Sequence, residues 1–478
     1  MASAPPVAAG LDAEAVDAFV AGIRGRVLRP GEPGYDEARA IWNGLIDRRP
    51  ALIVQPTGAA DVVDAVNFAR EHRLPLSIKG GGHNVAGNAV NDDGLVIDLS
   101  QMRGVHVDPT GIVRAEGGAT WGDCDRESQL FGLAVPGGVV STTGIGGLTL
   151  HGGVGHLRRK YGLSIDNLRS VDIVTADGRL RRASATENAD LFWAVRGAGS
   201  NFGVVTSFEF QAHPVGPQVM VGAIFYPLEQ ARTVIPAWRD YMASAPDELS
   251  SIALCWSVPP GEPFPVEHHG APVCVVAAVY SGSPEDGEAV VQPLRELGTP
   301  LIDLSGPWPW VGLQSGFDAL FPKGGLYYWK SKALAELTDA AIDEIVGYGE
   351  RRPTPITDIV IWHHGGAMSR VGETDTAYGG RDAGFLVTGE VSWTDPAQSD
   401  EGIAWGREFW NAMDKHSTGG LYLNFPGLGE EQEDLVRAGY GANYERLARL
   451  KAEYDPDNLF RLNPNIEPSR KADSPAMR

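Results

Sequence analysis

The chain has 478 residues, too many for one compact core, so we expect two domains. Its 43% hydrophobic and 21% charged residues are ordinary for a globular protein, whereas 60 glycines indicate many tight turns or close backbone approaches. The formal net charge of -21 argues against nucleic acid and anionic membranes as partners.

The cysteines and the first residues of the chain exclude further classes of protein. Cys124, Cys255 and Cys274 are scattered, odd in number and without CxxC spacing, which argues against a disulfide framework or a cysteine zinc site. The first residues show no basic start followed by an apolar core, and no apolar run approaches the ~20 residues that span a bilayer. We therefore expect a cytoplasmic protein with no membrane partner.

The first elements form a strand–helix–strand unit. Apolar residues between Leu11 and Ile23 recur at helical spacing and predict a first helix. Residues 51–56 predict a strand, Thr57 can cap the helix that follows, and residues 74–78 predict a second strand. A helix joining two strands implies parallel pairing with a right-handed crossover. The sequence KGGGHNVAG then lies at the carboxyl end of a parallel strand, where open α/β sheets bind ligands.

The next elements alternate with turns and a second glycine-dense loop. Strands or strand–turn units are expected at 94–100 and 111–121, followed by a helix from about Trp121 to Leu130. The glycine-dense loop covers 136–155. Residues 171–183 read as a hairpin with Asp177-Gly178 in its turn, and residues 204–210 alternate as a strand does.

The composition of the sequence changes after His213-Pro214. Glycine clusters thin out, and helical stretches alternate with strands expected at 219–226, 251–256, 273–281, 356–364 and 384–393. This pattern predicts a second domain with a large antiparallel sheet flanked by helices. Near the end of the chain, apolar residues from Tyr444 to Tyr454 predict a helix that stops at Asp455-Pro456.

Two glycine loops at strand ends suggest a phosphate-containing cofactor cradled by backbone N–H groups. The chain has no GxxxxGK[ST] sequence, so the loops are not a P-loop. GAGSNFG at 197–203 imitates a dinucleotide fingerprint, but it follows an apparent helix and precedes a strand. Because the Rossmann order is strand and then helix, this match carries little weight.

His83 follows three glycines in GGGHN, so no side chain separates the preceding backbone from a ligand. From its neighbours alone, it is either a loop histidine that bonds an adjacent turn or a functional residue. A metal site is not expected, because His363 and His364 are adjacent and no carboxylate cluster accompanies them.

Four segments carry a resemblance to a known family. IKGGGHNVAGNAVNDDGLVIDLSQM resembles the flavin-attachment segment of berberine-bridge-like FAD oxidases, in the vanillyl-alcohol oxidase superfamily. GVVSTTGIGGLTLHGGVGHLRRKYGLSIDNL resembles its second flavin segment, ENADLFWAVRGAGSNFGVVTSFEF its adenine and pyrophosphate segment, and NYERLARLKAEYDPDNLFRLNPNI its closing motif. The resemblance implies an α+β fold with an FAD domain of the PCMH type, built from residues 1–216 (core 47–216) and 419–478, and a substrate domain at 217–418.

The resemblance places His83 on the histidine that is bonded to the 8α carbon of the isoalloxazine. Val140 stands where many relatives carry a second, cysteine bond, so the implied attachment is single, as in the nicotine-oxidising bacterial members. The further positions that the resemblance assigns to FAD binding are Lys79, Gly80, Gly81, Gly82, Asn84, Gly87, Asp98, Val140, Thr142, Thr143, Gly144, Gly146, Gly147, Gly152, Gly155, Asn167, Gly203, Val205, Asn424 and Asn465.

The family's catalytic positions match only in part. Residues 421–425 resemble the strand that places a tyrosine and an asparagine beside the flavin, so Tyr422 and Asn424 are catalytic candidates, Tyr422 as a base or as an aligning donor. The alternative for Tyr422 is packing in the core. Ala367 and Val154 stand where plant relatives carry a lysine and a tyrosine, which weakens any transfer of their substrates.

Residues 325–331 crowd aromatic residues and a lysine into one expected strand. Alternation puts Tyr328 and Lys330 on one face, either toward the pocket as catalytic residues or in the sheet's packing. Arg370, Tyr378 and Arg381 are candidates for contact with an anionic or carbonyl substrate, the alternative being ion pairs with carboxylates.

The resulting hypothesis is an FAD-linked oxidase that passes hydride from a small organic substrate to flavin and then electrons to O₂, giving H₂O₂. Thr143 lies at the family position that controls oxygen access, and its small β-branched side chain favours an oxidase. A dehydrogenase with another electron acceptor and a non-catalytic flavin-binding protein are the alternatives. The sequence identifies neither the substrate, whether alcohol, amine or sugar, nor an oligomeric state.

Overall fold

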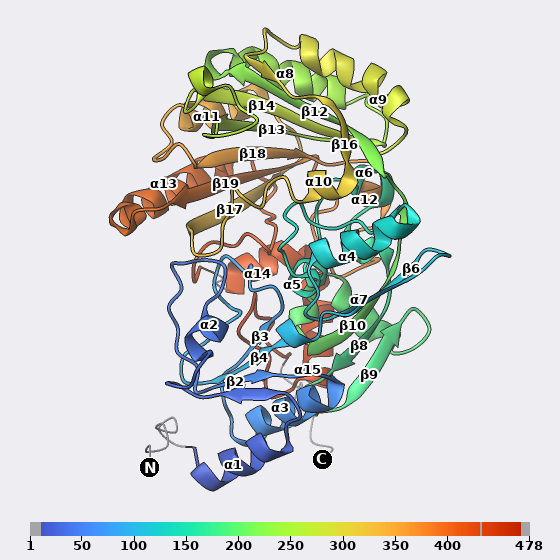
Figure 1. The fold of residues 1–478 in the computed structure, drawn as a ribbon, viewed down its shortest axis with the longest axis vertical. Helices are drawn as coiled ribbons and strands as arrows, with labels where there is room; N and C mark the ends of the chain where they lie inside the picture. Colours follow the sequence, from blue (N-terminus) through green and yellow to red (C-terminus); the bar gives the residue numbers. More distant parts are fainter. Residues whose placement is uncertain (1–10, 431–432, 470–478) are drawn as a thin grey trace, which may run out of the picture.

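The computed structural model describes residues 11–430 and 433–469, and the protein is an α+β protein, as predicted (Figure 1). In Figure 1 the large sheet and its helices occupy the upper half, whereas the N-terminal and C-terminal parts of the chain share the lower half. No helix within the described ranges has both the length and the apolar character that crossing a bilayer requires.

The first sheet is four-stranded, in the order β1-β2-β4-β3. Its strands are β1 (Arg26–Leu28), β2 (Leu52–Gln55), β4 (Leu95–Asp98) and β3 (Leu76–Lys79). The predicted direct pairing of β2 with β3 is wrong, because β4 lies between them and pairs in parallel with both. All four β4 residues are buried, which suits a strand with neighbours on both sides.

Helices α1 (Ala13–Gly22) and α3 (Ala59–Glu71) bury apolar side chains in one cluster with β2, β3 and β4, and α2 (Tyr35–Arg39) follows β1. The prediction that Thr57 caps α3 is wrong, because Gly58 is the N-cap residue and makes no side-chain cap bond. Thr57 instead donates its backbone N–H to Asp61, whose carboxylate also accepts the N–H groups of Arg24 and Gly25.

The second sheet is five-stranded and antiparallel, in the order β5-β6-β10-β8-β9. Its strands are β5 (Val105–Asp108), β6 (Ile112–Glu116), β10 (Val204–Gln211), β8 (Leu168–Val174) and β9 (Leu180–Ser184). The predicted β8–β9 hairpin and the β10 strand are confirmed. Nearby elements are α4 (Trp121–Ser128), α5 (Ile145–Leu150), α6 (Arg158–Tyr161), α7 (Ala189–Ala198), and the short pair β7 (Leu133–Ala134) and β11 (His213–Pro214).

The third sheet confirms the predicted large antiparallel sheet. It runs β15-β12-β14-β13-β18-β19-β17, with β16 paired to β12. The bounds are β12 (Gln218–Pro227), β13 (Leu249–Ser257), β14 (Pro272–Tyr280), β15 (Ile302–Asp303), β16 (Gly306–Pro309), β17 (Leu326–Leu334), β18 (Asp358–His363) and β19 (Phe385–Trp393).

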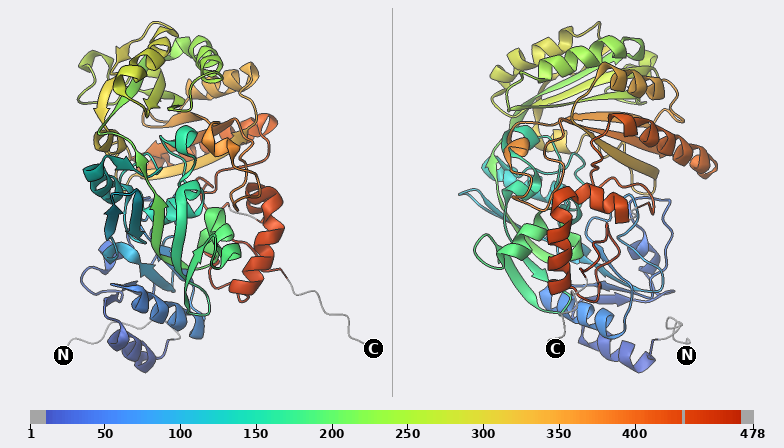
Figure 2. Two further views of the ribbon diagram at one scale, coloured as in Figure 1. Left: turned by 90° about the vertical axis from the view of Figure 1, so that its right-hand side faces the viewer. Right: turned by 180° about the vertical axis from the view of Figure 1, so that it is seen from behind.

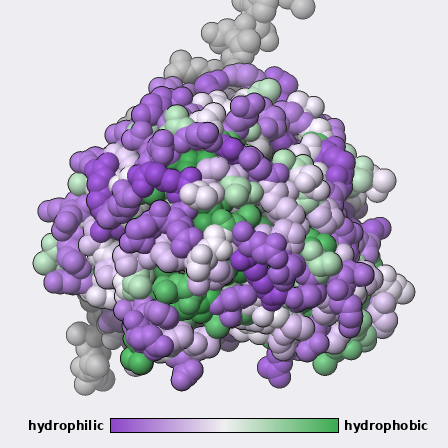
Figure 3. All heavy atoms as spheres, turned by 90° about the horizontal axis from the view of Figure 1, so that it is seen from above, coloured by the Kyte–Doolittle hydropathy of each residue, from purple (hydrophilic) through white to green (hydrophobic). Residues whose placement is uncertain are grey.

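The two faces of this sheet have different partners. One face packs in a core with side chains of α8 (Ala231–Met242), α9 (Pro284–Val291), α11 (Asp339–Gly349) and α13 (Ser399–Ala412). The other face packs against the second glycine loop, the residues that follow it and the C-terminal segment, including Val154, Ile165 and Tyr422. The short helices α10 (Trp310–Gln314) and α12 (Ala367–Arg370) lie at its margins. From above, the molecular surface is mostly hydrophilic with smaller apolar patches (Figure 3).

The end of the chain returns to the lower half of the molecule (Figure 2). Helices α14 (Glu433–Tyr440) and α15 (Tyr444–Tyr454) share a core cluster with α7, and the predicted final helix is confirmed. The strand expected at 421–425 is not formed. These residues make a turn in which the Phe425 N–H donates to the Tyr422 carbonyl at 2.8 Å.

Candidate functional site

The two glycine loops meet backbone to backbone. A Cβ added to Gly81 would lie 2.3 Å from the Gly144 nitrogen, and a Cβ added to Gly144 would lie 2.3 Å from the Gly81 nitrogen. Only glycine permits this approach, since no side chain fits between the two chains. The loop that follows β3 is thereby held against the loop that opens α5, and residues of both line one cavity.

His83 lies where these loops join. Its imidazole is within 3.0 Å of the Thr142 hydroxyl through Nε2 and 3.4 Å of the Thr143 hydroxyl through Nδ1. The ring stacks on Trp42 with centroids 5.0 Å apart. Burial and the charge of Lys323 lower the pKa of His83 to about 4, so the imidazole is neutral at neutral pH and keeps a nitrogen lone pair.

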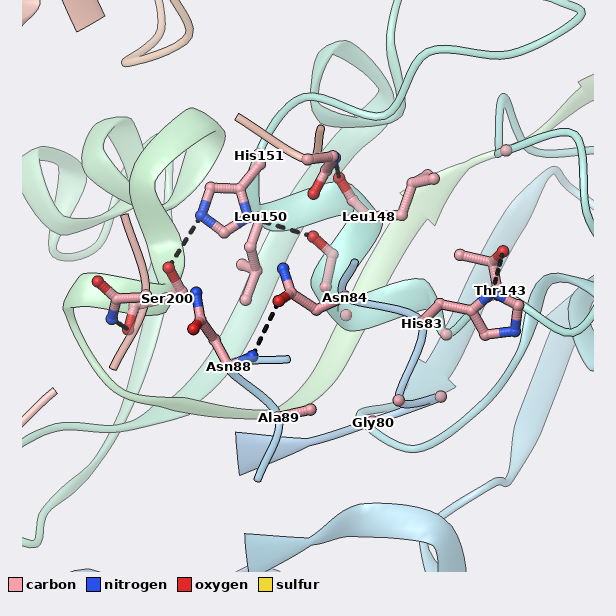
Figure 4. Close-up of a pocket in the computed structure, with 18 of the residues that line it drawn as sticks. Gly80, His83, Asn84, Asn88, Ala89, Thr143, Leu148, Leu150, His151 and Ser200 are labelled. Atoms are coloured by element: carbon pink, nitrogen blue, oxygen red, sulfur yellow. Dashed lines mark hydrogen bonds between the residues drawn. The ribbon is translucent and has the colours of Figure 1, made fainter. Parts of the chain in front are cut away.

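The other end of the loop region is built by His151, Ser200 and Asn463, which come from three distant segments. Ser200 shares a 2.9 Å hydrogen bond with His151 Nε2, and Asn463 donates to the Ser200 carbonyl at 2.9 Å. In Figure 4, His83 and Thr143 lie at one side of the view and His151 and Ser200 at the other, with Gly80, Asn84 and Ala89 between them. The C-terminal motif, which contains Asn463, thus lines the same cavity as the two glycine loops.

The loop residues fit a bound dinucleotide. Gly147 lines the cavity, and a Cβ added to it would meet no atom within 4 Å, so its lack of a side chain leaves room for a ligand rather than for the protein. Gly146 and Gly147 also belong to the first turn of α5, whose N–H groups have no partner within the helix. Backbone N–H groups beside such a space are donors suited to phosphate oxygens.

Aromatic rings close the His83 end of the cavity. Trp42 stacks on Tyr327 with centroids 3.8 Å apart, and Trp329 meets Phe321 and Phe425 edge-on at 5.2 and 5.4 Å. Trp42, Phe321, Trp329 and Phe425 all line the cavity. These rings make the wall of the cavity beside His83 largely apolar.

Tyr422 and Asn424 reach the cavity from the turn that replaces the expected strand. The Tyr422 hydroxyl oxygen accepts the Val154 N–H at 3.2 Å and an Asn424 amide N–H at 2.8 Å. Both lone pairs of the oxygen are then used, which leaves its own O–H to donate. Burial raises the pKa of Tyr422, so the phenol stays protonated at neutral pH.

Glu390 lines the same cavity from β19, and Asp358 lies opposite it on β18. The Thr388 hydroxyl donates to Glu390 at 2.9 Å. Burial raises the pKa of Glu390 to about 7, and burial together with Glu390 raises the pKa of Asp358 well above its usual range. Two adjacent buried carboxyls therefore stand on the cavity side of the large sheet.

The structure brings fourteen of the residues predicted from the sequence to the lining of this one cavity. They are Gly80, Gly81, Gly82, His83, Asn84, Val140, Thr143, Gly144, Gly146, Gly147, Gly203, Val205, Tyr422 and Asn424.

Other predicted positions support the fold around the cavity instead of lining it. Lys79 donates to the Ala38 carbonyl at 2.6 Å and lies 3.4 Å from Asp98. A Cβ on Gly87, Gly152 or Gly155 would collide with Ile46, Tyr378 or the Gly137 carbonyl, respectively.

Three further predicted residues form hydrogen bonds around the cavity. Asn167 donates to the carbonyls of Tyr161 and Leu163, and Asn465 donates to Glu467. Thr142 contacts His83.

Tyr328 and Lys330 share one face of β17, as predicted, but this face does not border the cavity. The Tyr328 hydroxyl donates to both Glu430 oxygens at 3.0 Å, and Lys330 forms an ion pair with the same carboxylate. Tyr328 packs in the core on the helix side of the large sheet. The structure therefore agrees with the alternative interpretation, in which this pair belongs to the packing of the sheet. The neighbouring residue Trp329 lines the cavity instead.

The three substrate-contact candidates Arg370, Tyr378 and Arg381 also lie outside the cavity lining. Arg381 is 2.7 Å from Asp166 and Arg370 is 2.7 Å from Asp247, so both arginines are engaged with carboxylates, the alternative that the sequence left open. Tyr378 packs against Gly152 and meets the Tyr422 ring edge-on at 6.4 Å.

Sequence reasoning missed several lining residues, among them Trp42, Ser200, Glu390 and Asn463. Trp42 precedes the first predicted strand in a segment without periodicity, so no local signal identifies it. Glu390 did carry a signal, since it is the one charged residue in a buried strand whose other residues are apolar or hydroxyl-bearing.

Comparisons with known proteins agree with this geometry. The model of an FAD binding domain matches residues 50–184, and the model described as "Berberine and berberine like" matches residues 421–467. The two matches contain the glycine loops and the C-terminal motif that meet around the cavity.

Individual relatives match along nearly the whole chain. An FAD-linked oxidoreductase of Dictyostelium discoideum is 33% identical over 95% of this chain and 97% of its own length. The (R)-6-hydroxynicotine oxidase of Paenarthrobacter nicotinovorans is 32% identical over 93% of this chain and 97% of its own.

Solved structures show the same arrangement. The 6-hydroxy-D-nicotine oxidase of Arthrobacter nicotinovorans is 31% identical, with a TM-score of 0.83 over 94% of this chain and 98% of that chain. A chitooligosaccharide oxidase is 26% identical, with a TM-score of 0.85 over 95% of this chain and 100% of that chain.

Proposed function

Because this chain belongs to the berberine-bridge-like family of FAD-linked oxidoreductases, we propose that it is an oxidase whose FAD is tethered through a single covalent bond to His83. One observation carries the proposal: the neutral imidazole of His83 lies in the cavity where the two glycine loops meet. We assign cofactor binding to residues 1–216 and 419–478, and substrate binding to residues 217–418.

The chemistry of His83 supports the tether. Bond formation to a flavin carbon requires an imidazole nitrogen with a free lone pair, and a pKa of about 4 supplies it throughout the neutral range. The Thr142 and Thr143 hydroxyls and the Trp42 ring fix the orientation of the imidazole. Val140 lines the cavity at the position of the family's second attachment and has no atom that can form such a bond, which supports a single bond.

The remaining residues orient the reactants. FAD held by His83 and the glycine loops would supply the hydride acceptor for a substrate C–H, with O₂ as the final electron acceptor and H₂O₂ as the product. Tyr422 donates its O–H into the cavity as an aligning group, since its raised pKa makes it a poor base. Asn424 holds the Tyr422 oxygen in place. The aromatic rings around Trp329 keep water away from the substrate.

The size of Thr143 supports an oxidase over a dehydrogenase, because this small side chain lines the cavity and leaves space for O₂. Named oxidases among the relatives and solved structures point the same way. Those relatives act on nicotine derivatives and oligosaccharides, so the substrate here is a small organic molecule.

The test uses the purified holoenzyme and three probes: 6-hydroxynicotine, a chitooligosaccharide and an aryl alcohol. We expect at least one probe to bleach the flavin without oxygen, and the same probe to drive O₂ uptake with equimolar H₂O₂ in air. Flavin reduction with no O₂ uptake, but with rapid reduction of dichlorophenolindophenol, would identify a dehydrogenase. A flavin that no organic donor reduces would indicate a binding protein.

A further inference from the structure

Glu390 and Asp358 form a pair of buried carboxyls that the proposed chemistry does not yet use. They face each other across β19 and β18 in direct register, and each is 5% exposed. Trp329 lies opposite Glu390 on the other neighbouring strand, β17. The three side chains thus form one row on the cavity side of the large sheet, and Glu390 and Trp329 line the cavity.

Neither carboxyl has a counter-cation within the part of the chain that the structure describes. Glu390 accepts one hydrogen bond, from Thr388, and Asp358 Oδ1 is buried without any hydrogen-bond partner. The charge of Arg352 acts on Asp358, but its N–H groups donate to the Gly349 and Trp256 carbonyls and to Ser257.

An unpaired buried carboxylate is unfavourable, because the low-dielectric interior does not replace the water it has lost. A second carboxyl at the next strand adds repulsion when both are ionised. A cation that enters the cavity would remove both penalties. The site is therefore selective by charge: it stabilises a positively charged group beside Glu390 and offers a neutral hydroxyl no equivalent gain.

The aromatic residues that line the cavity favour an organic cation over a metal ion. Trp329, Trp362 and Phe425 line the cavity with Glu390, and the faces of aromatic rings attract ammonium groups. Divalent cations such as Ca²⁺ or Mg²⁺ instead require six or more oxygen ligands, and here one carboxylate reaches the lining. The Trp362 indole N–H donates to the Thr388 hydroxyl at 3.4 Å, and Thr388 in turn donates to Glu390, which holds the carboxylate in place.

We propose that the cavity receives its substrate as an ammonium cation on an apolar body, with the Glu390 carboxylate accepting an N–H hydrogen bond and then that proton, which leaves the neutral amine that can pass hydride. Asp358 lies directly behind it on β18 and stays protonated while Glu390 is ionised, because burial and the charge of Glu390 raise the pKa of Asp358. The inference rests on the proposed function and narrows its substrate class to amines.

The test compares two probes that differ in charge and cannot be oxidised at the carbon that bears the polar group. These are 2-phenylpropan-2-amine, an ammonium ion at pH 8, and 2-phenylpropan-2-ol, its neutral counterpart. Calorimetric titration of the holoenzyme should give an amine affinity at least about tenfold above that of the alcohol, which corresponds to ~1.4 kcal/mol. Glu390→Gln keeps the size and removes the charge, so the preference should fall to about twofold or less.

A matched control is Glu401→Gln, which removes an exposed carboxylate on α13 and should keep the preference. Equal binding of both probes by the wild type, no binding of the amine, or a preference that survives Glu390→Gln would overturn the proposal. The comparison of the two probes in the wild type tests the proposal even if Glu390→Gln does not fold.

Failure of this inference is distinguishable from failure of the proposed function. If a neutral alcohol or sugar reduces the flavin and the amine shows no preference, only the substrate class is wrong. If the purified protein carries no flavin, the oxidase proposal fails, and the two titrations still report on the carboxyl pair.

Discussion

His83 and Val140 are the two residues on which the proposed single attachment of FAD depends. Both line the cavity. The histidine is neutral and oriented, whereas the valine has no atom that can bond to a flavin. Under this proposal the number of bonds to FAD depends on these two side chains.

This account predicts that Val140→Cys restores a covalent flavin to a chain that lacks His83. In His83→Ala alone, an acid-precipitated pellet should be colourless and the FAD should appear in the supernatant. In the double variant His83→Ala/Val140→Cys the pellet should be yellow. The control places the cysteine at Val139, which also lines the cavity, and should give a colourless pellet. A colourless Val140→Cys pellet would show that this position does not reach the flavin.

The pKa of Glu390 sets a pH dependence for amine binding. The groups beside it are Asp358 on β18, with Arg352 acting on Asp358, and the uncharged Trp329 and Thr388. Tyr422 lines the same cavity and stays protonated. Burial raises the pKa of Glu390 to about 7, and its charge then raises the pKa of Asp358, so Glu390 ionises first.

The carboxylate is thus present above pH 7 and lost as the pH falls below it. Between pH 8 and pH 6 the affinity of the wild type for 2-phenylpropan-2-amine should fall about tenfold, while that for the neutral alcohol stays constant. Calorimetric titrations at half-unit intervals measure this. An amine affinity that is flat across this range would mean that Glu390 is not the acceptor.

At the scale of elements, helix α15 anchors the C-terminal motif through a buried ion pair. Lys451 and Asp455 lie 2.6 Å apart and are almost inaccessible to solvent. Asp455 accepts the N–H groups of Leu459 and Phe460, and Lys451 donates to the Asn201 carbonyl. These bonds place the segment that contains Phe460 and Asn463 at the cavity.

Lys451→Met should destabilise the protein by about 3 kcal/mol, because it leaves a buried carboxylate without its cation. We expect a Tm several degrees lower by circular dichroism. Lys415→Met, which removes an exposed lysine paired with Glu344, serves as the control and should change the Tm little. Equal effects of the two substitutions would mean that the buried pair does not anchor the motif.

Several elements were predictable from the sequence because their patterns are local. The period-two strands β12, β13, β14, β18 and β19 and the amphipathic α15 match the expectations. The insertion of β4 between β2 and β3 was not predictable, because pairing order depends on which strand is buried on both faces. At 421–425 a turn replaces a strand because the Tyr422 backbone bonds the Ser331 side chain of β17 and the Phe425 N–H, so it forms no backbone ladder.

The candidate site was predictable to a similar extent. The glycine loops and His83 stand in contiguous motifs, whereas the face that a strand turns to a cavity depends on distant partners. Tyr328 and Lys330 illustrate this, since both contact Glu430, which belongs to a distant segment, and Tyr328 packs on the helix side of the sheet. Glu390 pairs with Asp358, 32 positions earlier, and no single segment contains both.

At the scale of the whole molecule, the cavity exists only while the large sheet stays on the glycine loops. Asp125 on α4 accepts the Trp310 indole N–H at 2.9 Å and a Gln314 amide N–H at 3.1 Å, which joins α4 to α10 in a buried contact. Asp318 accepts the Ser141 N–H at 2.9 Å on the same side. These contacts fix the sheet over Val140 and Thr143.

Trp310→Phe should cost about 2 kcal/mol, because it removes one donor from a buried carboxyl while keeping most of the ring's packing. Thermal denaturation measures the loss. Trp308→Phe, at a half-buried tryptophan two residues earlier, should have a smaller effect. If Trp308→Phe lowers the stability of the protein as much as Trp310→Phe does, the Asp125 contact does not hold α4 and α10 together.

The central claim is that FAD is bonded once, to His83. Acid precipitation of the purified protein, followed by the absorption spectrum and peptide masses of the pellet, tests it directly. The account predicts a yellow pellet in which the peptide that contains His83 carries the mass of FAD and no other peptide does. A colourless pellet, or FAD on a different peptide, would contradict it.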